Sequence, residues 1–362
     1  MGYNRTANAN ELSFRAKMNT YYSTLPMDAA DVNLVTGASG FIGSNLVDRL
    51  TDQGQKVRAL HRSPAPGDRY PQSGLAVEQR GDITDIDSLH TAMDGCSRVF
   101  HLAGYARNWA RDPRTYWKIN VDGLKNVLDV ARESGVRRVV WTSSVMALGP
   151  TPPGQICDET YHCPGHLRHT HYEFSKLEAE KLARSYVTEF GMEVITVNPT
   201  RVFGPGPLTE GNALAKLMND YDLGRAPFLL NGGRNVGNFV YVQDVVQGLL
   251  LAMRHGRPGE RYVLGGENKT LKEFLDTLDS VSGKRHFRVT VRWPLSLSTA
   301  YLMQWRAKWF GIHPPITPPW VRSFMSEWAY SSKKAADELG YHPMPLEESI
   351  GLTYDWLIQQ RG

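Results

Sequence analysis

A tyrosine and a lysine stand four residues apart in the stretch "HYEFSKLEAEKLARSYVTEFG" (171–191), as Tyr172 and Lys176. The stretch has the spacing of a helix, so the two side chains share one helical face. A phenol has an ordinary pKa of about 10, and a neighbouring ammonium group lowers this pKa because it stabilises the phenolate. The pair therefore predicts proton transfer to or from an oxygen atom, with Tyr172 as general acid or base.

A serine elsewhere in the chain can complete this pair. Ser144 ends the stretch "VRRVVWTSS" (136–144), whose apolar residues predict a buried strand. A hydroxyl at the carboxyl end of such a strand can orient the reacting oxygen atom by a hydrogen bond. Because Tyr-x-x-x-Lys arises by chance in many amphipathic helices, the prediction of a catalytic trio depends on the elements around it.

Three histidines precede the tyrosine in "HLRHTHY", as His166, His169 and His171. Residues two apart on a helix face different ways, and no set of cysteines or carboxylates completes a coordination shell. We therefore predict no metal site here. Thr170 is the expected N-cap of the helix, and His169 and His171 are expected at the mouth of a substrate site.

A glycine-rich turn, "TGASGFIG" (36–43), follows the first predicted strand and opens the first predicted helix. Gly37 permits the sharp turn, Gly40 lets the backbone approach a pyrophosphate, and Gly43 lets the helix pack on the sheet. The helix N-terminus adds amide donors for the phosphates. The turn therefore predicts a dinucleotide cofactor, and Lys176 gains a second predicted role as a donor to the nicotinamide ribose.

The end of the second predicted strand, "KVRALHR" (56–62), bears on which dinucleotide is bound. A carboxylate there usually holds the ribose of NAD, but this strand ends in His61 and Arg62. A guanidinium group suits a 2′-phosphate, so we favour NADP(H) over NAD(H). Asp82, in "RGDITD", is expected either to accept a hydrogen bond from the adenine amine or to cap the helix that follows.

Strands and helices alternate from Asp31 onward, which predicts an α/β fold with a doubly wound parallel sheet, the Rossmann fold. We expect this dinucleotide-binding domain over 31–199, with 238–266 returning to it. The segments 200–237 and 267–362 are expected to form a smaller, partly helical substrate lobe. Residues 1–30 are expected to be a flexible extension.

The bulk composition excludes several classes of protein. A net charge of +4 over 362 residues is too small an excess for a dedicated nucleic-acid surface. Three cysteines without regular spacing make a disulfide framework unlikely, which favours a reducing, cytoplasmic location. No apolar run reaches the roughly 20 residues of a membrane span.

The stretch "STAYLMQWRAKWFG" (298–311) concentrates aromatic residues on a predicted helix. A stripe of this kind can contact a membrane or a lipid substrate if it is exposed. Packing against the core is the commoner arrangement, and we predict it here.

Seven motifs follow one another along the chain: "TGASGFIG", "GDITD", "HLAG", "NVDGLKNVL", "TSS", "YEFSK" and "NPTRVFGPG". In this order they resemble the extended short-chain dehydrogenases/reductases of the NAD-dependent epimerase/dehydratase superfamily, over about 32–360. Within that family the chain is most similar to dihydroflavonol-4-reductase-like and 3β-hydroxysteroid dehydrogenase-like proteins. It is also similar to bacterial proteins of the hopanoid-associated sugar epimerase type.

The resemblance implies roles for individual residues. Ser144, Tyr172 and Lys176 would be the catalytic trio, and Asn120 would have a structural or proton-relay role. A homodimer would form through the helices of 112–135 and 171–190. The residues that would line the cofactor are Gly37, Gly40, Phe41, Ile42, Gly43, Arg62, Asp82, Ile83, Leu102, Ala103, Gly104, Tyr172 and Lys176, with Pro199 and Val202 near the nicotinamide.

Two activities in this family use this trio: reduction of a ketone, and epimerisation or dehydration of a nucleotide sugar. The sequence favours the first. Sugar-nucleotide members of the family usually carry an arginine two residues before the Phe of "FVYV", where Gly237 stands. Arg234 lies three residues earlier, roughly 10 Å away in an extended segment, although Arg201 is a feature that many sugar enzymes share.

The expected substrate residues are largely aromatic: Tyr105, Trp109, His169, His171 and Phe203. Apolar walls suit a hydrophobic molecule. We therefore predict an NAD(P)H-dependent enzyme that interconverts a ketone and a secondary alcohol on a hydrophobic small molecule. The alternative is a nucleotide-sugar epimerase or dehydratase that uses the same trio and a tightly bound NAD.

Overall fold

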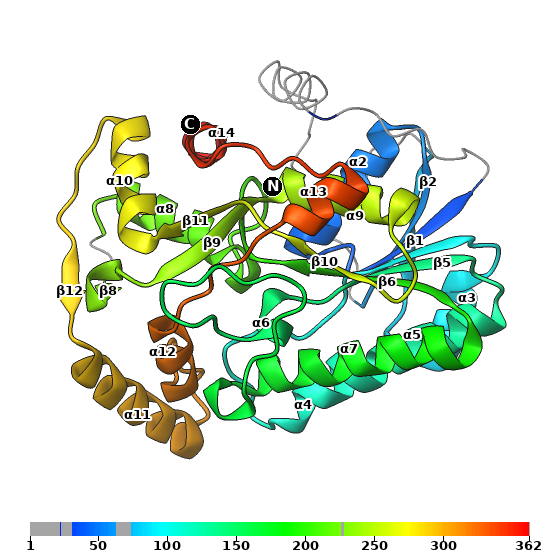
Figure 1. Cartoon of the computed structure of the whole chain (residues 1–362), viewed down its shortest axis with the longest axis horizontal. Helices are drawn as coiled ribbons and strands as arrows, with labels where there is room; N and C mark the ends of the chain where they lie inside the picture. The colour runs from blue at the N-terminus through cyan, green and yellow to red at the C-terminus, as the bar shows by residue number, and fades with distance from the viewer. Residues whose placement is uncertain (1–21, 23–30, 63–73, 226–227, 362) are drawn as a thin grey trace.

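The computed structural model describes residues 22, 31–62, 74–225 and 228–361. Its centre is a seven-stranded sheet in the order β10-β6-β5-β4-β1-β2-β3, with every neighbouring pair parallel (Figure 1). This sheet confirms the predicted doubly wound α/β fold. The strands are β1 (Val32–Thr36), β2 (Lys56–His61), β3 (Ala76–Arg80), β4 (Arg98–His101), β5 (Arg138–Thr142), β6 (Glu193–Pro199) and β10 (Arg261–Leu264).

The central strands are apolar because helices cover both faces of the sheet. Val35 of β1 pairs with Ala59 of β2 and Phe100 of β4, and all three are fully buried. In Figure 1 one layer of helices lies above the sheet and another below it. The first layer contains α2 (Phe41–Asp52), α9 (Val242–His255) and α13 (Lys333–Leu339), and the second contains α3 (Ile86–Met93), α5 (Gly123–Glu133) and α7 (His171–Phe190).

The sheet order reverses at β1, which has β2 on one side and β4 on the other. The two connections that leave β1 and β4 therefore run to opposite faces, and the carboxyl ends of such strands are where ligands bind in folds of this type. The predicted glycine turn leaves β1 at this edge, and Ser144 follows β5 at the same edge. The fold thus brings the two predicted sites together.

A smaller lobe packs beside the main sheet. Its three-stranded sheet has the order β11-β9-β7, and a second pair joins β12 to β8. Its core includes Phe203, Phe239 and Phe274. The elements are β7 (Arg201–Phe203), α8 (Ala213–Asp222), β8 (Phe228–Leu230), β9 (Val236–Tyr241), β11 (Glu267–Thr270), α10 (Leu271–Ser282), β12 (Val289–Val291), α11 (Trp293–Phe310), α12 (Pro318–Met325) and α14 (Leu346–Gln359).

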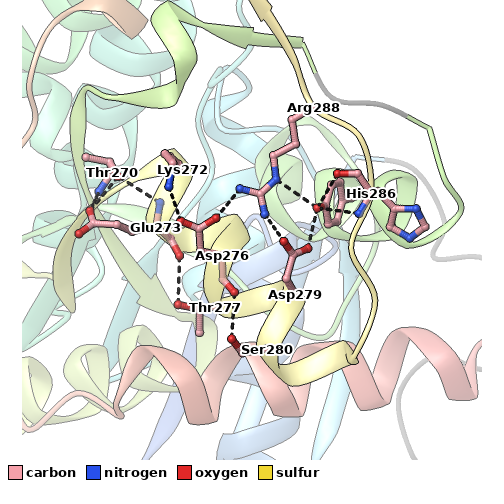
Figure 2. Close-up of polar contacts among 10 residues, drawn as sticks. Thr270, Lys272, Glu273, Asp276, Thr277, Asp279, Ser280, His286 and Arg288 are labelled. Atoms are coloured by element: carbon pink, nitrogen blue, oxygen red, sulfur yellow. Dashed lines mark hydrogen bonds and ion pairs between the residues drawn. The ribbon is translucent and has the colours of Figure 1, made fainter.

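Helix α10 shows how local sequence starts an element of this lobe. Thr270 accepts a hydrogen bond from the N–H of Glu273, whose carboxylate accepts from the N–H of Thr270 (Figure 2). This capping box satisfies two backbone donors at the start of the helix. Gly283 ends the helix with a left-handed φ of 68°, which glycine adopts without strain.

The predicted return of 238–266 to the main sheet needs a correction. Helix α9 and strand β10 do return, as a covering helix and as the edge strand next to β6. Strand β9 pairs instead with β7 and β11 in the small sheet. Its apolar pattern indicates a buried strand, but a pattern does not specify which strand lies beside it.

The predicted flexible extension, 1–30, lies outside the described residues except for Tyr22. The Tyr22 side chain is buried against Tyr241 and Met344. Its hydroxyl donates to Oδ1 of Asp244 at 2.6 Å, and its carbonyl oxygen accepts from the guanidinium group of Arg49. At this position the chain is therefore packed against the domain.

The prediction that the aromatic stretch 298–311 packs against the core is wrong. Helix α11 packs chiefly on α12, at the edge of the molecule (Figure 1). Only its small residues Ser296, Ala300 and Ala307 are buried, whereas Trp305 and Trp309 are 55% and 70% exposed. The core of the lobe is filled from other elements, so these aromatic side chains remain outside it.

Candidate active site

The glycine turn joins β1 to α2 with no room for a side chain at Gly37 or Gly43. Gly37 has a φ of 68°, and a Cβ atom there would lie 2.7 Å from the backbone N of Ala103. A Cβ atom on Gly43 would lie 2.2 Å from the carbonyl oxygen of Gly37. Gly40 is the N-cap of α2, and no side chain of the described residues caps this helix. The first N–H groups of α2 have no partner within the helix, so the turn fits the pyrophosphate of a dinucleotide.

Two other segments border this turn. The strand end at Leu102 and Ala103 lies against Gly37. On the other side a Cβ atom on Gly206 would lie 2.9 Å from Cδ2 of Phe41, and Asn45 of α2 donates to the carbonyl oxygen of Pro205. Four of the predicted cofactor residues thus lie beside this turn or pack on the hydrophobic core between β1 and α2: Phe41, Ile42, Leu102 and Val202. Pro199 ends β6 at the same edge of the sheet.

The remaining predicted cofactor residues lie along the β2–β3 side. Asp82 follows β3, and its Oδ1 accepts hydrogen bonds from the N–H and hydroxyl of Thr84, both at 2.9 Å. The cap of α3 is Asp85, which accepts from Ser88, so Asp82 is not the helix cap. Ile83 is buried against Gly123. Arg62 follows β2 and is exposed to solvent.

The three predicted catalytic residues come together at the carboxyl ends of β5 and β6. Tyr172 lies in the first turn of α7, which Thr170 caps as predicted by accepting from the N–H of Glu173 at 3.1 Å. The Tyr172 side chain lies next to that of Ser144, which follows β5 and whose carbonyl oxygen accepts a hydrogen bond from the Asn198 side chain. Lys176 lies one turn along α7, as its spacing predicts.

Lys176 is 4% exposed and is fixed by the strand beneath it. Its Nζ donates to the carbonyl oxygen of Thr142 at 2.9 Å and lies 5.1 Å from the centre of the Trp141 ring. A Cβ atom on Gly104 would lie 3.6 Å from this Nζ. The ammonium group thus lies between the strand end at Thr142 and the predicted cofactor residue Gly104.

The proton affinities differ from the prediction in one respect. Burial raises the pKa of Tyr172 to about 12, although the hydrogen bond with Ser144 acts in the opposite direction. This shift is opposite in direction to the predicted one, and the ammonium group of Lys176 is directed at the carbonyl oxygen of Thr142. Burial lowers the pKa of Lys176 itself to about 8, and Glu180 opposes this shift. The phenol is therefore neutral at ordinary pH and suited to donate a proton.

Asn120 ties the catalytic helix to the loop that follows β4. It lies in a π-helical turn, Lys118–Asp122, between α4 (Arg114–Trp117) and α5. Its Oδ1 accepts from the N–H of Tyr105 at 2.7 Å, and its Nδ2 donates to the hydroxyl of Ser175 at 2.9 Å. Single π-turns inside helices are frequent at functional sites. These bonds give Asn120 a positioning role.

The predicted substrate residues fall into two groups. Tyr105 and Trp109 lie on the loop after β4, where the Tyr105 hydroxyl donates to the carbonyl oxygen of Trp109. Tyr105 also packs edge-on against Tyr116, with ring centres 5.0 Å apart. Phe203 is fully buried against Phe274 in the core of the small lobe. Phe203 is therefore a core residue. The sequence pattern of β7 did not indicate this, because it does not show which face of the strand is covered.

The two histidines at the start of α7, His169 and His171, have different neighbours. His171 packs edge-on against Trp117, with ring centres 5.4 Å apart. His169 lies near Arg322 of α12, and burial and this positive charge lower its pKa. In the described ranges, no group of three His, Cys, Asp or Glu residues is close enough to hold a metal ion.

Two further interactions were not predicted from the sequence. His101 ends β4, where its Nδ1 lies 2.7 Å from the hydroxyl of Thr36, and burial lowers its pKa to about 3. The Thr36 hydroxyl also accepts from the N–H of Ala103, so this pair fixes the strand end that carries the predicted cofactor residue Ala103. Glu173, fully buried in α7, lies next to the side chain of Ser323 in α12. The "HLAG" motif was the available signal for His101, whereas the Glu173 contact joins distant segments and leaves no local signal.

Residues 33–265 match the model of the NAD dependent epimerase/dehydratase family. The chain belongs to this family. The match confirms the predicted resemblance, and the family's cofactor agrees with the glycine turn and the uncapped N-terminus of α2.

Several relatives within this family match almost the whole chain. A protein from Synechocystis sp. (strain ATCC 27184 / PCC 6803 / Kazusa), named as a dihydroflavonol 4-reductase, is 33% identical over 92% of this chain and 96% of its own length. Sterol demethylase protein B of Methylococcus capsulatus is 32% identical over 91% and 98%, respectively. A 3-beta-hydroxysteroid dehydrogenase of Mycolicibacterium neoaurum is 29% identical over 89% of each chain. The crystal structure of gox2253 covers 91% of this chain and 98% of its own, with 32% identity and a TM-score of 0.77.

Proposed function

We propose that the protein is an NADP(H)-preferring oxidoreductase that interconverts a ketone and a secondary alcohol on a hydrophobic small molecule. One observation carries this proposal: the Tyr172 side chain lies next to that of Ser144 and one helical turn from Lys176, at the sheet edge next to the glycine turn. A bound reduced nicotinamide supplies the hydride. The protein supplies the proton and the orientation.

In the reducing direction the carbonyl carbon accepts the hydride, and the carbonyl oxygen takes the proton of the Tyr172 hydroxyl. The high pKa of Tyr172 keeps this proton on the phenol until the oxygen becomes negative. Ser144 donates to the same oxygen and stabilises its developing charge. Lys176, held by the carbonyl oxygen of Thr142, positions the ribose of the cofactor.

Support for a hydrophobic substrate comes from the loop after β4. Tyr105 and Tyr116 pack together, and the Tyr116 ring lies near Tyr172. Trp109 is adjacent, with His313 edge-on to it at 5.4 Å between ring centres. Aromatic side chains of this kind recognise an apolar molecule by contact area, with few polar groups to fix it. The names of the relatives, which refer to a dihydroflavonol, a sterol and a steroid, agree with this class.

The preference for NADP(H) depends on Arg62. It follows β2, where the ribose of the adenosine half is bound in such folds, and no acidic residue takes that place. A guanidinium group can hold a 2′-phosphate through two hydrogen bonds.

A second candidate is a nucleotide-sugar epimerase or dehydratase, and Arg201 favours it. Although Gly237 has no side chain, the guanidinium group of Arg201 occupies the space beside it. A cation therefore stands next to the position where the sugar enzymes carry theirs. Arg201 lies against the rings of Phe239 and Phe324, at 5.7 and 5.5 Å.

The test compares the two activities on the same purified protein. We expect the protein to oxidise NADPH when lipophilic ketones are supplied. The loss of absorbance of the reduced nicotinamide measures this reaction. The variant Tyr172→Phe should lose at least about 99% of this activity, since one general acid contributes a factor of roughly 100 to 10,000. Tyr186→Phe, which alters a tyrosine farther along α7 bonded to Asp129, is the matched control and should remain active.

Interconversion of nucleotide sugars by protein that retains its cofactor, without turnover of any ketone, would establish the second candidate instead. If the Tyr172→Phe variant binds the cofactor and reduces ketones normally, the assigned acid is incorrect.

A further inference from the structure

Helix α11 has the reverse of the usual arrangement of side chains. The side that packs on the protein carries the small residues Ser296, Ala300 and Ala307, and the opposite side carries the large apolar ones. An ordinary surface helix buries its large apolar residues and exposes polar ones. With this pattern inverted, the large side chains point away from the part of the chain that the structure describes.

These large residues form a single stripe along the helix. Leu295, Leu302, Trp305 and Trp309 are separated by seven, three and four residues, so they lie above one another on one face. Their exposed fractions are 63%, 65%, 55% and 70%. The two tryptophan rings are 6.0 Å apart. We call these four residues the α11 stripe.

The charge around the stripe has one sign. From Ser280 to Ser326 the chain has seven Lys or Arg residues and no Asp or Glu. Lys284 and Arg288 are neutralised by Asp222 and by Asp276 and Asp279; Figure 2 shows the Arg288 pairs.

Three other cations of this segment are exposed. Arg292, Arg306 and Lys308 form no ion pair within the part of the chain that the structure describes. Arg306 and Lys308 flank Trp305 by one and three residues, which places them on opposite sides of the stripe. The stripe is thus an apolar surface with a positive border.

We propose that α11 lies flat on the surface of a bilayer that contains anionic lipid, with the α11 stripe in the boundary between headgroups and acyl chains. Tryptophan is favoured at this depth because its ring is apolar and its N–H is polar, and Lys and Arg reach the lipid phosphates. No helix of the described residues is long and apolar enough to cross a membrane, α11 included. The inferred contact is therefore with one leaflet.

A lipid surface accounts for both the apolar α11 stripe and its positive border. A second copy of this face does not, because it would bring the unpaired cations together. Two copies in contact through the stripe would place Arg306 and Lys308 of one near those of the other, with no carboxylate from this segment between them. An anionic bilayer complements the border and accepts the stripe.

The position of α11 gives this contact a consequence, which rests on the proposed function. Arg322 of α12 donates to the hydroxyl of Tyr301 of α11 and also lies near His169. The segment after α11 contacts the loop of Trp109, where Asn108 donates to the carbonyl oxygen of Pro315. A bilayer beneath α11 would therefore lie beside the candidate substrate residues, and a lipophilic substrate could enter directly from it.

The test is cosedimentation of the full-length protein with vesicles made of equal parts of phosphatidylglycerol and phosphatidylcholine. We expect the wild type to bind these vesicles, and to bind pure phosphatidylcholine vesicles much more weakly. The double variant Trp305→Ser/Trp309→Ser should reduce the partition coefficient at least about tenfold. Phe190→Ser is the matched control, because Phe190 is 47% exposed at the far end of α7 and should not alter binding.

A second variant separates the role of charge from that of apolar area. Arg306→Gln/Lys308→Gln keeps the stripe intact and should lose most of the preference for anionic vesicles, as should the wild type at high salt. Equal sedimentation of the wild type and the tryptophan double variant would overturn the inference. So would a wild type that binds no vesicle but forms a larger oligomer than the tryptophan double variant in solution, since the stripe would then be an interface between copies.

The vesicle test needs no turnover, and Tyr172→Phe should bind vesicles like the wild type. Vesicle binding can therefore be interpreted even if the protein reduces no ketone, and ketone reduction can be interpreted even if the protein binds no vesicle.

Discussion

The guanidinium group of Arg201 fills the space that a side chain at position 237 would need. A Cβ atom on Gly237 would lie 2.8 Å from Cζ of Arg201, closer than packed atoms approach. The two residues lie on neighbouring parallel strands, β7 and β9. Burial lowers the pKa of Arg201 to about 10, which still leaves it charged at neutral pH. The observed position of the Arg201 side chain thus requires a residue without a side chain at position 237.

Gly237→Ala should therefore destabilise the protein by displacing Arg201. We expect a loss of about 1–3 kcal/mol in the free energy of unfolding, typical of added atoms in a packed region. In an Arg201→Ala background the same change should cost less than about 1 kcal/mol, because the space is then open. Denaturant unfolding of the four proteins in this cycle measures the coupling. Equal costs in both backgrounds would mean that the two side chains do not compete for the space.

Gly43→Ala should weaken cofactor binding. The added Cβ atom would lie 2.2 Å from the carbonyl oxygen of Gly37, so the turn must open to admit it. We expect an increase in the cofactor Kd of at least about tenfold, or about 1.4 kcal/mol. Calorimetric titration with NADPH measures it. Gly165→Ala is the control, because nothing lies within 4 Å of a Cβ atom there. If the two variants bind alike, the turn is not the pyrophosphate site.

The sequence predicted the sheet and the shared helical face of Tyr172 and Lys176, because both follow from local patterns. Alternating strands and helices determine a doubly wound fold, and the four-residue spacing places Tyr172 and Lys176 on one face of α7. Thr170 was predicted as a cap from its residue type, and it does cap the helix. These features depend on neighbours in the chain, which a sequence shows directly.

Features that depend on distant contacts were not predicted. Phe203 and the aromatic residues of α11 look alike in the sequence, yet Phe203 is fully buried and Trp309 is largely exposed. The difference arises because other segments, such as the one that contains Phe274, cover β7, whereas no described segment covers the stripe. In the same way, the contact of Lys176 with Thr142 depends on how α7 lies across β5.

The rate of ketone reduction should fall as the pH rises above about 8. Burial lowers the pKa of Lys176 to about 8, so its ammonium group loses its proton above that pH. Tyr172, with a pKa of about 12, stays protonated in this range and cannot cause the decline. The profile of kcat/KM against pH should therefore show one alkaline limb near pH 8. A profile that stays flat to about pH 10, close to the ordinary pKa of lysine, would contradict this assignment.

Asp244 accepts hydrogen bonds from the hydroxyl of Tyr22 and the backbone N–H of Met344. Burial raises the pKa of this carboxyl from 3.8 to about 7. Between these two pH values the folded chain keeps a proton that the unfolded chain releases. The stabilisation is therefore complete below about pH 4 and is lost as the pH rises through 7.

Asp244→Asn removes this titration while retaining an oxygen that accepts from Tyr22. The stability of the variant relative to the wild type should therefore increase from about pH 4 to 7, by at most about 4 kcal/mol for a shift of roughly three pKa units. Any change in the hydrogen bond to Met344 adds a constant offset, so the slope with pH is the informative quantity. Asp337→Asn, at an exposed ion pair with Lys333, should leave the slope unchanged. Denaturant unfolding across this pH range measures it, and parallel curves for the wild type and Asp244→Asn would show that Asp244 is already ionised in the folded protein.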